Sequence, residues 1–438
     1  MNQHLVIVLP MAGWGTRMRP HTWNKPKALC RTAGGTTLDY IFRQFAPLHD
    51  HYQSIDYVLI LNSPDHHAQI DAYLQQHIQP QTTELNIHYV FQQVMNGQSP
   101  AIFLAKEFLT GPMILAFADT LIDTDFSLIT REPATAIAWG VHVAEPQHYG
   151  VAALDEQGWV RHVKEKPQQY IGSLAMVGTY YFPSGEQVVS SIERQIARGI
   201  HKDEEDPQDA NGKEFFIVPA INLMIKEDGL RMRVEETSAM YDAGRPQTML
   251  ETSQYLLEKY PPQTIEELRA RFGEDVVLHA PLFIADNVQI KNAVVGPNAS
   301  IAGNTVIEDA KISHSILGES CIVQQVNLKN SLLGDRVAVR GISTGEYSLN
   351  LGDDAAFEQF AVDAAAETVV RCHSGAAYAE KPTALFWEGS WLDVTTILTR
   401  WRSQQGRGFR VRTADSRQFT LLYDETTDTW QIAEYVGS

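Results

Sequence analysis

The sequence predicts an α/β protein in three parts: a Rossmann-like domain on a mixed, mainly parallel sheet, a left-handed parallel β-helix, and a small β-rich C-terminal module. Up to about Gly244, apolar segments alternate with amphipathic ones, which is the pattern of βαβ units. From Val276, apolar residues recur at every fifth or sixth position. Beyond Gly341 this recurrence fades, and short aromatic-rich segments typical of strands follow.

The length of the chain agrees with several domains. A chain of 438 residues is too long for one ordinary hydrophobic core. We expect the α/β domain at 1–250, a connecting helix or linker at 251–275, the β-helix at 276–372 and the β-rich module at 382–438. The sequence assigns no role to the last module.

Charge and cysteine content narrow the classes of partner and location. With 35 basic and 53 acidic side chains the net charge is −18, which disfavours nucleic acid or an anionic membrane as the main partner. Cys30, Cys321 and Cys372 lie far apart, without the spacing of a metal site or a disulfide framework. The N-terminus lacks the features of a signal peptide, and no segment is long and apolar enough to span a bilayer. These features predict a cytoplasmic protein.

The first apolar run, Leu5–Leu9, leads directly into a glycine loop. The run is short and β-branched, as expected of a buried strand. Gly13 and Gly15 have no Cβ, so that backbone N–H groups can come close to an anion. Arg17 and Lys27 add the positive charge that several phosphates require. The segment therefore predicts a nucleotide site, although a plain βα turn would explain the glycines alone.

Two common phosphate-binding motifs do not fit this loop. A dinucleotide-binding fingerprint needs a third glycine where Met18 stands, and the Gly-Lys-Ser/Thr of a Walker A loop is absent. The run from Ala12 to Arg17, followed by Pro26-Lys27, resembles the signature of the sugar nucleotidyltransferases, or NDP-sugar pyrophosphorylases. The resemblance implies catalytic roles for Arg17 and Lys27. It also implies contacts to the nucleotide from Ala12, Gly13, Gly15 and Thr16.

The segments that follow continue the α/β alternation. We expect helices over 37–45, 65–76 and 101–108, and strands over 57–61, 87–91 and 113–117. Ligands of such sheets collect beyond the carboxyl ends of the strands, so we expect the site at that edge.

Polar residues follow two of these strands. Gln92 and Gly97 come after the strand at 87–91, and the resemblance implies that they read the base, since a glutamine amide both donates and accepts hydrogen bonds. A polar turn before a helix is the alternative. Asp119 follows the strand at 113–117. The resemblance implies that it binds Mg²⁺, whereas an ordinary N-cap is the alternative, which we favour for Asp123 and Asp125.

The next motifs lie on an expected hairpin and a following strand. Two strands flank a polar turn at 155–158, and they carry Tyr149-Gly150-Val151 and Glu165-Lys166-Pro167. The resemblance places this pair in the half of the domain that holds the sugar, although Glu-Lys-Pro alone would be a surface turn. It implies a catalytic role for Lys166 at the sugar phosphate. The implied sugar-binding residues are Tyr149, Gly150, Glu165 and, on a strand over 175–182, Gly178.

The last site element is Asp242, in the run Tyr241–Pro246. It precedes an expected helix over 247–259, so a helix-start residue is the alternative. The resemblance implies a second carboxylate ligand for Mg²⁺ here. Between the two halves we expect helices over 187–199 and 215–226. The polar run at 201–212, rich in acids, is expected to be a solvated insertion.

The repeat that predicts the β-helix is irregular. About four coils can be recognised from apolar residues at Ile284, Ile290, Val295, Ile301, Ile307 and Ile312. In the family resembled, such coils serve assembly or regulation, which implies a homo-oligomer, and in bifunctional members they carry acyl transfer. His314 is the one candidate for an acyltransferase base, and a histidine at a coil edge is the simpler interpretation. In the C-terminal module, strands and one short helix are expected, and its arginines are read as a solvated face.

The resemblance implies a Mg²⁺-dependent enzyme that condenses a nucleoside triphosphate with a sugar 1-phosphate, giving a nucleotide sugar and pyrophosphate. Two alternatives stay open. One is a non-catalytic regulatory or scaffold protein that binds a nucleotide sugar on the same fold, and the other is a bifunctional enzyme with an acyltransferase β-helix. The base, the sugar and the position of Trp14 do not follow from the sequence.

Overall fold

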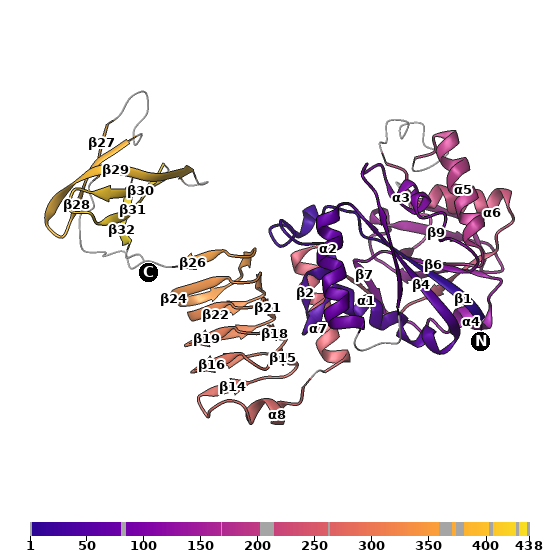
Figure 1. The fold of residues 1–438 in the computed structure, drawn as a ribbon, viewed down its shortest axis with the longest axis horizontal. Helices are drawn as coiled ribbons and strands as arrows, with labels where there is room; N and C mark the ends of the chain where they lie inside the picture. The colour runs from indigo at the N-terminus through magenta and orange to yellow at the C-terminus, as the bar shows by residue number, and fades with distance from the viewer. Residues whose placement is uncertain are drawn as a thin grey trace. The chain divides into compact units, whose positions relative to one another are not determined.

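The computed structural model describes residues 2–79, 85–167, 169–201, 214–261, 263–358, 370–373, 381–402, 406–425 and 429–435. The chain forms two compact units, Met1–Phe357 and Glu358–Ser438. The first unit holds an α/β domain and a β-helix, and the second is a β module (Figure 1). The acidic part of the expected insertion, at 202–212, lies outside the described residues.

The α/β domain is built on a mixed nine-stranded sheet whose main path runs β10-β9-β11-β6-β1-β4-β5. The half around β1 is parallel, and β11 pairs antiparallel with β6, β8 and β9. This confirms the predicted Rossmann-like sheet. Its strands are β1 (Asn2–Pro10), β4 (Tyr52–Leu61), β5 (Asn86–Phe91), β6 (Met113–Ala116), β8 (Ala136–His142), β9 (Gly150–Leu154), β10 (Val160–Glu165), β11 (Leu174–Phe182) and β12 (Met232–Glu236).

Strand β1 is the centre of this domain. All five residues Leu5–Leu9 are fully buried, and alternate side chains point to opposite faces of the sheet. Leu5, Ile7 and Leu9 pack on one side, and Val6 and Val8 pack on the other. Both faces of β1 are thus covered, as is typical of a central strand. The loop after β1 therefore emerges from the middle of the sheet at its carboxyl edge.

Helices cover both faces (Figure 1). Those of one face are α1 (Thr37–Phe45), α2 (Pro64–Tyr73, continued by a π-helical turn over Leu74–Ile78) and α7 (Pro246–Lys259). Those of the other face are α3 (Gln98–Leu104), α5 (Gly185–Arg198) and α6 (Val218–Glu227). The bounds of α1 match the prediction, whereas α3 begins and ends earlier than the expected 101–108. It begins directly after Gly97, which pairs with Phe215, and Ala105 already leaves the helical conformation.

Small elements complete the first domain. Strand β7 (Thr120–Ile122) pairs antiparallel with β13 (Met240–Asp242), and helix α4 (Leu128–Arg131) follows β7 in the chain. A short hairpin of β2 (Arg31–Thr32) and β3 (Gly35–Thr36) precedes α1. Helix α8 (Ile265–Arg269) leads into the β-helix. No helix in the described ranges has the length and apolar character needed to cross a membrane.

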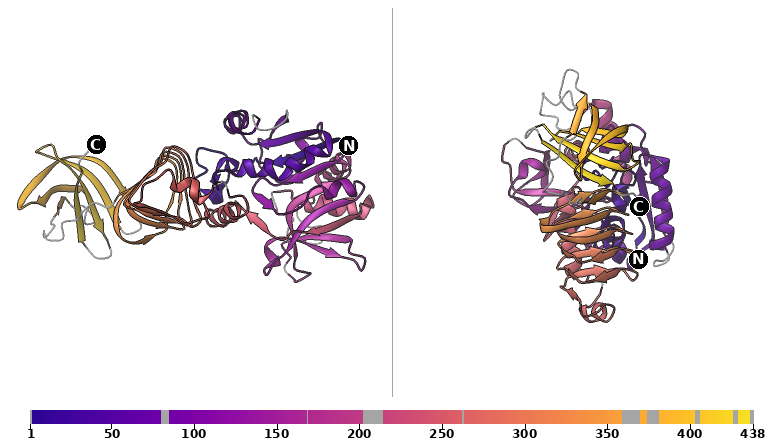
Figure 2. Two further views of the ribbon diagram at one scale, coloured as in Figure 1. Left: turned by 90° about the horizontal axis from the view of Figure 1, so that it is seen from below. Right: turned by 90° about the vertical axis from the view of Figure 1, so that its left-hand side faces the viewer.

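The predicted β-helix is confirmed as stacked parallel coils, which the left-hand view of Figure 2 shows nearly end-on. One side is a five-stranded sheet in the order β15-β18-β21-β23-β25, one strand more than the four coils recognised in the sequence. The last coil also keeps apolar residues on its core side, since Leu349 and Leu351 pack against the core and Leu351 pairs with Leu333. The left-handedness of the β-helix stays a prediction. The strands are β14 (Val276–Leu278), β15 (Leu282–Ile284), β16 (Gln289–Lys291), β17 (Ala293–Val295), β18 (Ala299–Ile301), β19 (Val306–Glu308), β20 (Lys311–Ser313), β21 (Ser315–Leu317), β22 (Ile322–Lys329), β23 (Leu332–Leu333), β24 (Ala338–Tyr347), β25 (Asn350–Leu351) and β26 (Ala356–Glu358).

The repeat positions form the core of the coils. Ile284, Val295 and Ile301 are fully buried, and Ile284 pairs with Ile301 one coil further on. Corners between the strands are turned by residues with left-handed backbone, including Asn298 and His314. The position of His314 at a coil corner agrees with its simpler interpretation as a histidine at a coil edge.

The C-terminal unit is a six-stranded antiparallel sheet: β27 (Val370–His373), β28 (Lys381–Trp387), β29 (Ser390–Arg402), β30 (Gly406–Thr413), β31 (Gln418–Asp424) and β32 (Thr429–Tyr435). Strand β27 pairs with β28, so residues 370–372 belong to this sheet and not to the β-helix, where the sequence pattern places them.

The expected short helix of this module is wrong for the described residues, where every regular element is a strand. Val394, Ile397 and Trp401 have the spacing of a helix face. They lie instead on β29, whose register shifts between Val394 and Thr396 and again between Ile397 and Thr399. These irregularities break the alternation of a strand and produce an apparently helical pattern.

Gly296 should be indispensable to the β-helix. Its φ is +99°, and a Cβ there would lie 1.9 Å from the carbonyl oxygen of His279. Gly345 is a matched control, because its φ is +92° but no atom lies within 4 Å of the added Cβ. Calorimetry of the full chain should show that Gly296→Ala costs about 3 kcal/mol or more, against about 1–2 kcal/mol for Gly345→Ala. Equal losses would contradict the steric argument.

Candidate functional site

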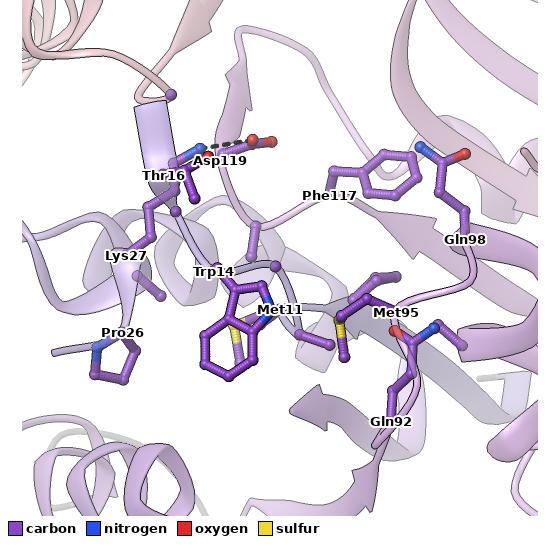
Figure 3. Close-up of a pocket in the computed structure, with 18 of the residues that line it drawn as sticks. Met11, Trp14, Thr16, Pro26, Lys27, Gln92, Met95, Gln98, Phe117 and Asp119 are labelled. Atoms are coloured by element: carbon purple, nitrogen blue, oxygen red, sulfur yellow. Dashed lines mark hydrogen bonds and ion pairs between the residues drawn. The ribbon is translucent and has the colours of Figure 1, made fainter. Parts of the chain in front are cut away.

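A cavity of about 420 Å³ opens at the carboxyl edge of the sheet, where β1, β5 and β6 end (Figure 3). Its lining comes from four stretches: 10–17, 26–28, 92–101 and 117–119, together with Glu214 and Gly244. The predicted nucleotide-binding residues all line it, namely Ala12, Gly13, Gly15, Thr16, Gln92 and Gly97, as do Arg17, Lys27 and Asp119.

Gly13 and Gly15 have different structural roles in the loop. Gly15 has a φ of +60° and begins a short 3₁₀ turn over Thr16–Met18, and its carbonyl oxygen accepts a 2.8 Å hydrogen bond from the Thr22 hydroxyl. Gly13 has no such strain, and a Cβ on it would meet no atom within 4 Å. The conformation of the loop therefore requires Gly15, whereas Gly13 leaves open space at the cavity.

Two cations, Arg17 and Lys27, lie beside Asp119, the carboxylate that follows β6. Lys27 Nζ donates a 2.7 Å hydrogen bond to Asp119 Oδ2, which is the dashed contact in Figure 3, and a guanidinium nitrogen of Arg17 lies 3.9 Å from the same oxygen. Burial alone would raise the pKa of Asp119, but Lys27 and Arg17 hold it below its ordinary value. Two cations thus share one carboxylate at the cavity wall, an arrangement suited to taking up an anion.

Asp242 is brought to the same edge as Asp119 by the pairing of β7 with β13. Asp242 pairs with Thr120, and the N–H of Ala243 donates a 2.8 Å hydrogen bond to the carbonyl oxygen of Asp119. The Asp242 carboxylate accepts a 2.6 Å hydrogen bond from the N–H of Gly244 and a weak 3.5 Å one from Thr248. Its neighbour Gly244 lines the cavity, and Asp242 itself does not.

Gln92 and Gly97 hold the turn between β5 and α3. Gln92 is buried, and its Nε2 donates to the carbonyl oxygen of Gly97 at 3.0 Å. Gly97 has a φ of +115°, and a Cβ there would lie 2.3 Å from the nitrogen of Phe215. The pairing with Phe215 thus requires a glycine at this position.

The expected sugar-binding residues form a cluster of their own on the hairpin of β9 and β10. The N–H of Lys166 donates a 2.8 Å hydrogen bond to the carbonyl oxygen of Tyr149, and a Cβ on Gly150 would lie 3.0 Å from a Glu165 carboxylate oxygen. None of these four lines the cavity. The fifth expected residue, Gly178, does not line it either, but its carbonyl oxygen accepts a 3.3 Å hydrogen bond from the N–H of Phe117, which does.

Sequence reasoning missed several apolar and polar residues of the cavity: Met11, Met95, Gln98, Phe117 and Glu214. Gln98 and Glu214 meet there because Gly97 pairs with Phe215, a contact between distant positions that no local pattern reveals. Met11 and Phe117 directly follow β1 and β6, so their places next to predicted site residues were a usable signal. Trp14 also lines the cavity with 56% of its surface exposed, so its indole does not pack beneath the loop.

Several known proteins are similar to this chain. The bifunctional protein GlmU of Methanococcus aeolicus is 23% identical over 354 residues, covering 72% of this chain and 77% of the relative. A glucose-1-phosphate thymidylyltransferase of Streptomyces antibioticus is 27% identical, covering 58% and 73%. Among solved structures, a UDP-glucose pyrophosphorylase from Acinetobacter baumanii matches with a TM-score of 0.47 and 17% identity, covering 62% of this chain and 98% of the other.

A family-level match covers the whole site. The family described as nucleotidyl transferase matches residues 6–257, which is more than half of the chain and includes the glycine loop and both aspartates. The chain therefore belongs to the nucleotidyl transferase family, whose members are enzymes that transfer nucleotidyl groups.

Proposed function

We propose that this enzyme transfers a nucleotidyl group from a nucleoside triphosphate to a sugar 1-phosphate, forming a nucleotide sugar and pyrophosphate. The observation that carries the proposal is the cluster of Lys27, Arg17 and Asp119 at the wall of the cavity, with Asp242 at the same edge. Two relatives that are glucose-1-phosphate thymidylyltransferases of Streptomyces support it.

The chemistry needs no side-chain nucleophile. An oxygen of the sugar phosphate attacks the α-phosphorus, forming the new O–P bond, while the bond to the leaving pyrophosphate breaks in line with it. Arg17 and the backbone N–H groups of the glycine loop stabilise the negative charge of the pyrophosphate. Lys27 faces the phosphates at the reacting centre. Catalysis then consists of positioning and charge stabilisation by groups already in place.

Enzymes of this family generally use divalent metal ions. We assign Mg²⁺ to Asp119 and Asp242, because Mg²⁺ is commonly held by one or two carboxylates together with water and phosphate oxygens. The described residues contain no group of three or more His, Cys, Asp or Glu side chains that would form a complete protein cage. The bound ion would neutralise charge on the phosphates.

The rest of the cavity is assigned to the base. Trp14, Met11 and Met95 give it apolar walls, and Gln92 and Gln98 add amide groups that can discriminate base edges. The hairpin cluster of Tyr149, Gly150, Glu165 and Lys166, with Gly178, is the proposed sugar subsite. Assembly into a homo-oligomer stays a prediction.

The alternatives are less well supported. A non-catalytic nucleotide-sugar-binding protein has no need for Lys27, Arg17, Asp119 and Asp242 together, and all four are present. Relatives named as bifunctional fit the acyltransferase alternative only partly, since nothing in the coil-corner setting of His314 indicates an acyl-transfer site.

A matrix of nucleoside triphosphates against sugar 1-phosphates, assayed for pyrophosphate release with Mg²⁺, should show one dominant pair. Removal of the metal with a chelator should abolish release, since the phosphate charge is then unscreened. If no pair releases pyrophosphate while nucleotide sugars still bind, the regulatory alternative replaces this proposal.

Asp242→Asn tests the second metal carboxylate. It keeps the size of the side chain and should lower kcat by about 100-fold while leaving the melting temperature nearly unchanged. Asp125→Asn is the matched control, because Asp125 lies on an exposed loop, where it accepts a 2.9 Å hydrogen bond from the N–H of Ser127 and forms an exposed ion pair with Arg131. Equal kcat values for the two variants would remove Asp242 from the metal site.

The two loop glycines give a test that needs no turnover. Gly13→Ala should leave the melting temperature unchanged and weaken binding of nucleoside triphosphates, because its Cβ enters only the open space of the cavity. Gly15→Ala should lower the melting temperature by several degrees, since the residue has positive φ and its Cβ would lie 3.0 Å from Thr22. Calorimetry and titration with a panel of triphosphates measure both effects. Unimpaired binding by the Gly13 variant would mean that phosphates do not approach this part of the loop.

A further inference from the structure

The segment between the two halves of the glycine-loop signature contacts the β-helix. His21 Nε2 lies 2.6 Å from Asn350 Oδ1, and Asn24 Nδ2 donates a 3.2 Å hydrogen bond to Asp353. Further along, the guanidinium of Arg31 pairs with Glu319. The signature loop thus faces the cavity on one side and is bonded to the coils on the other.

The centre of this contact is Lys25. Its Nζ lies 2.7 Å from Asp335 Oδ2 and 3.0 Å from Asp353 Oδ2. The two carboxylates occupy corners of successive coils, where the N–H of Asp335 donates a 3.0 Å hydrogen bond to Asp353 Oδ1. Burial alone would lower the pKa of Lys25, but the two carboxylates raise it above its ordinary value, so the ammonium stays charged.

This ion pair is largely shielded from water. The exposed fractions of the Lys25, Asp335 and Asp353 side chains are 16%, 18% and 7%. The next ion pair on the same corner, Arg336 with Asp354, has exposed fractions of 53% and 62%. Removing one partner of a shielded pair leaves an uncompensated charge behind, whereas an exposed pair loses little.

Only Pro26 separates Lys25 from Lys27. Its ring fixes φ at −59°, it lines the cavity, and Lys27 begins the 3₁₀ turn that follows it. Both sides of the segment are also packed, since Met18 and Cys30 lie in one buried cluster with Ile316 and Leu332 of the β-helix. A shift of Lys25 would therefore pass through a stiff link to Lys27.

We propose that Lys25 is a positioning residue, held by Asp335 and Asp353 of the β-helix so that Lys27 is aimed at the reacting phosphates. The coils then serve the reaction directly, as the surface against which the catalytic loop is ordered. This inference rests on the proposed function for the role of Lys27, but the anchoring of the loop is testable without it.

Kinetics with the dominant substrate pair test the positioning role. Lys25→Met should lower kcat by about 10- to 100-fold and leave KM for the sugar 1-phosphate nearly unchanged, because the displaced group is a catalytic cation and not the sugar subsite. Lys25→Arg should restore most of kcat. Asp353→Asn should lower kcat in the same direction, whereas its matched control Asp354→Asn should not, since Asp354 lies on the same corner in an exposed pair.

Backbone hydrogen exchange separates this inference from the proposed function. In Lys25→Met and Asp353→Asn, residues 13–30 should exchange faster than in the parent, and in Asp354→Asn they should not. A parent protein that releases no pyrophosphate overturns the proposed function, while the exchange result still decides whether the anchor orders the loop. Unchanged exchange, or faster exchange with unchanged kcat, overturns the positioning role. If Lys25→Met does not fold, Asp353→Asn, which keeps the side-chain volume and the other carboxylate, decides the question by the same criteria.

Discussion

The contact between Lys27 and Asp119 is the interaction on which the site depends. A chain with a net charge of −18 must create a local positive surface to hold a polyanion. It does so by placing the loop after β1 beside the end of β6, which is possible because these strands are parallel neighbours in the sheet. Lys27 and Arg17 then share Asp119, so the two cations are held in place before any phosphate arrives.

The sequence predicted the fold where one face of an element is buried in regular alternation or helical periodicity. Strand β1 and helices α1 and α7 appear nearly where their apolar patterns place them. The prediction failed where pairing changes the local pattern. The irregular register of β29 imitates a helix, and the start of α3 is set by the distant Phe215. Such features depend on neighbours far away in the sequence, which no local window contains.

The residues of the site divide in the same way, into those that a local pattern reveals and those that depend on distant contacts. The residues of the glycine loop and Asp119 could be located because they sit at strand ends, and the ends of parallel strands share one edge. Gln98 and Glu214 could not, since they reach the cavity only through the contact of Gly97 with Phe215. Gly97 also has a structural reason that the sequence does not reveal, because its missing Cβ leaves room for the backbone of Phe215. The sugar subsite stays a prediction, as its residues cluster on the hairpin outside the cavity.

The corner of the β-helix also needs the catalytic domain. Asp335 and Asp353 stack one coil apart, and two like charges that are mostly shielded from water repel each other unless a cation lies between them. Lys25 supplies that cation, and Arg31 Nε lies 3.4 Å from Asp335 Oδ1. The corner is thus neutralised by the same segment that it holds in place. Order in the coil and order in the loop are therefore mutually dependent. A change to the β-helix corner shifts the position of Lys27, two residues beyond Lys25.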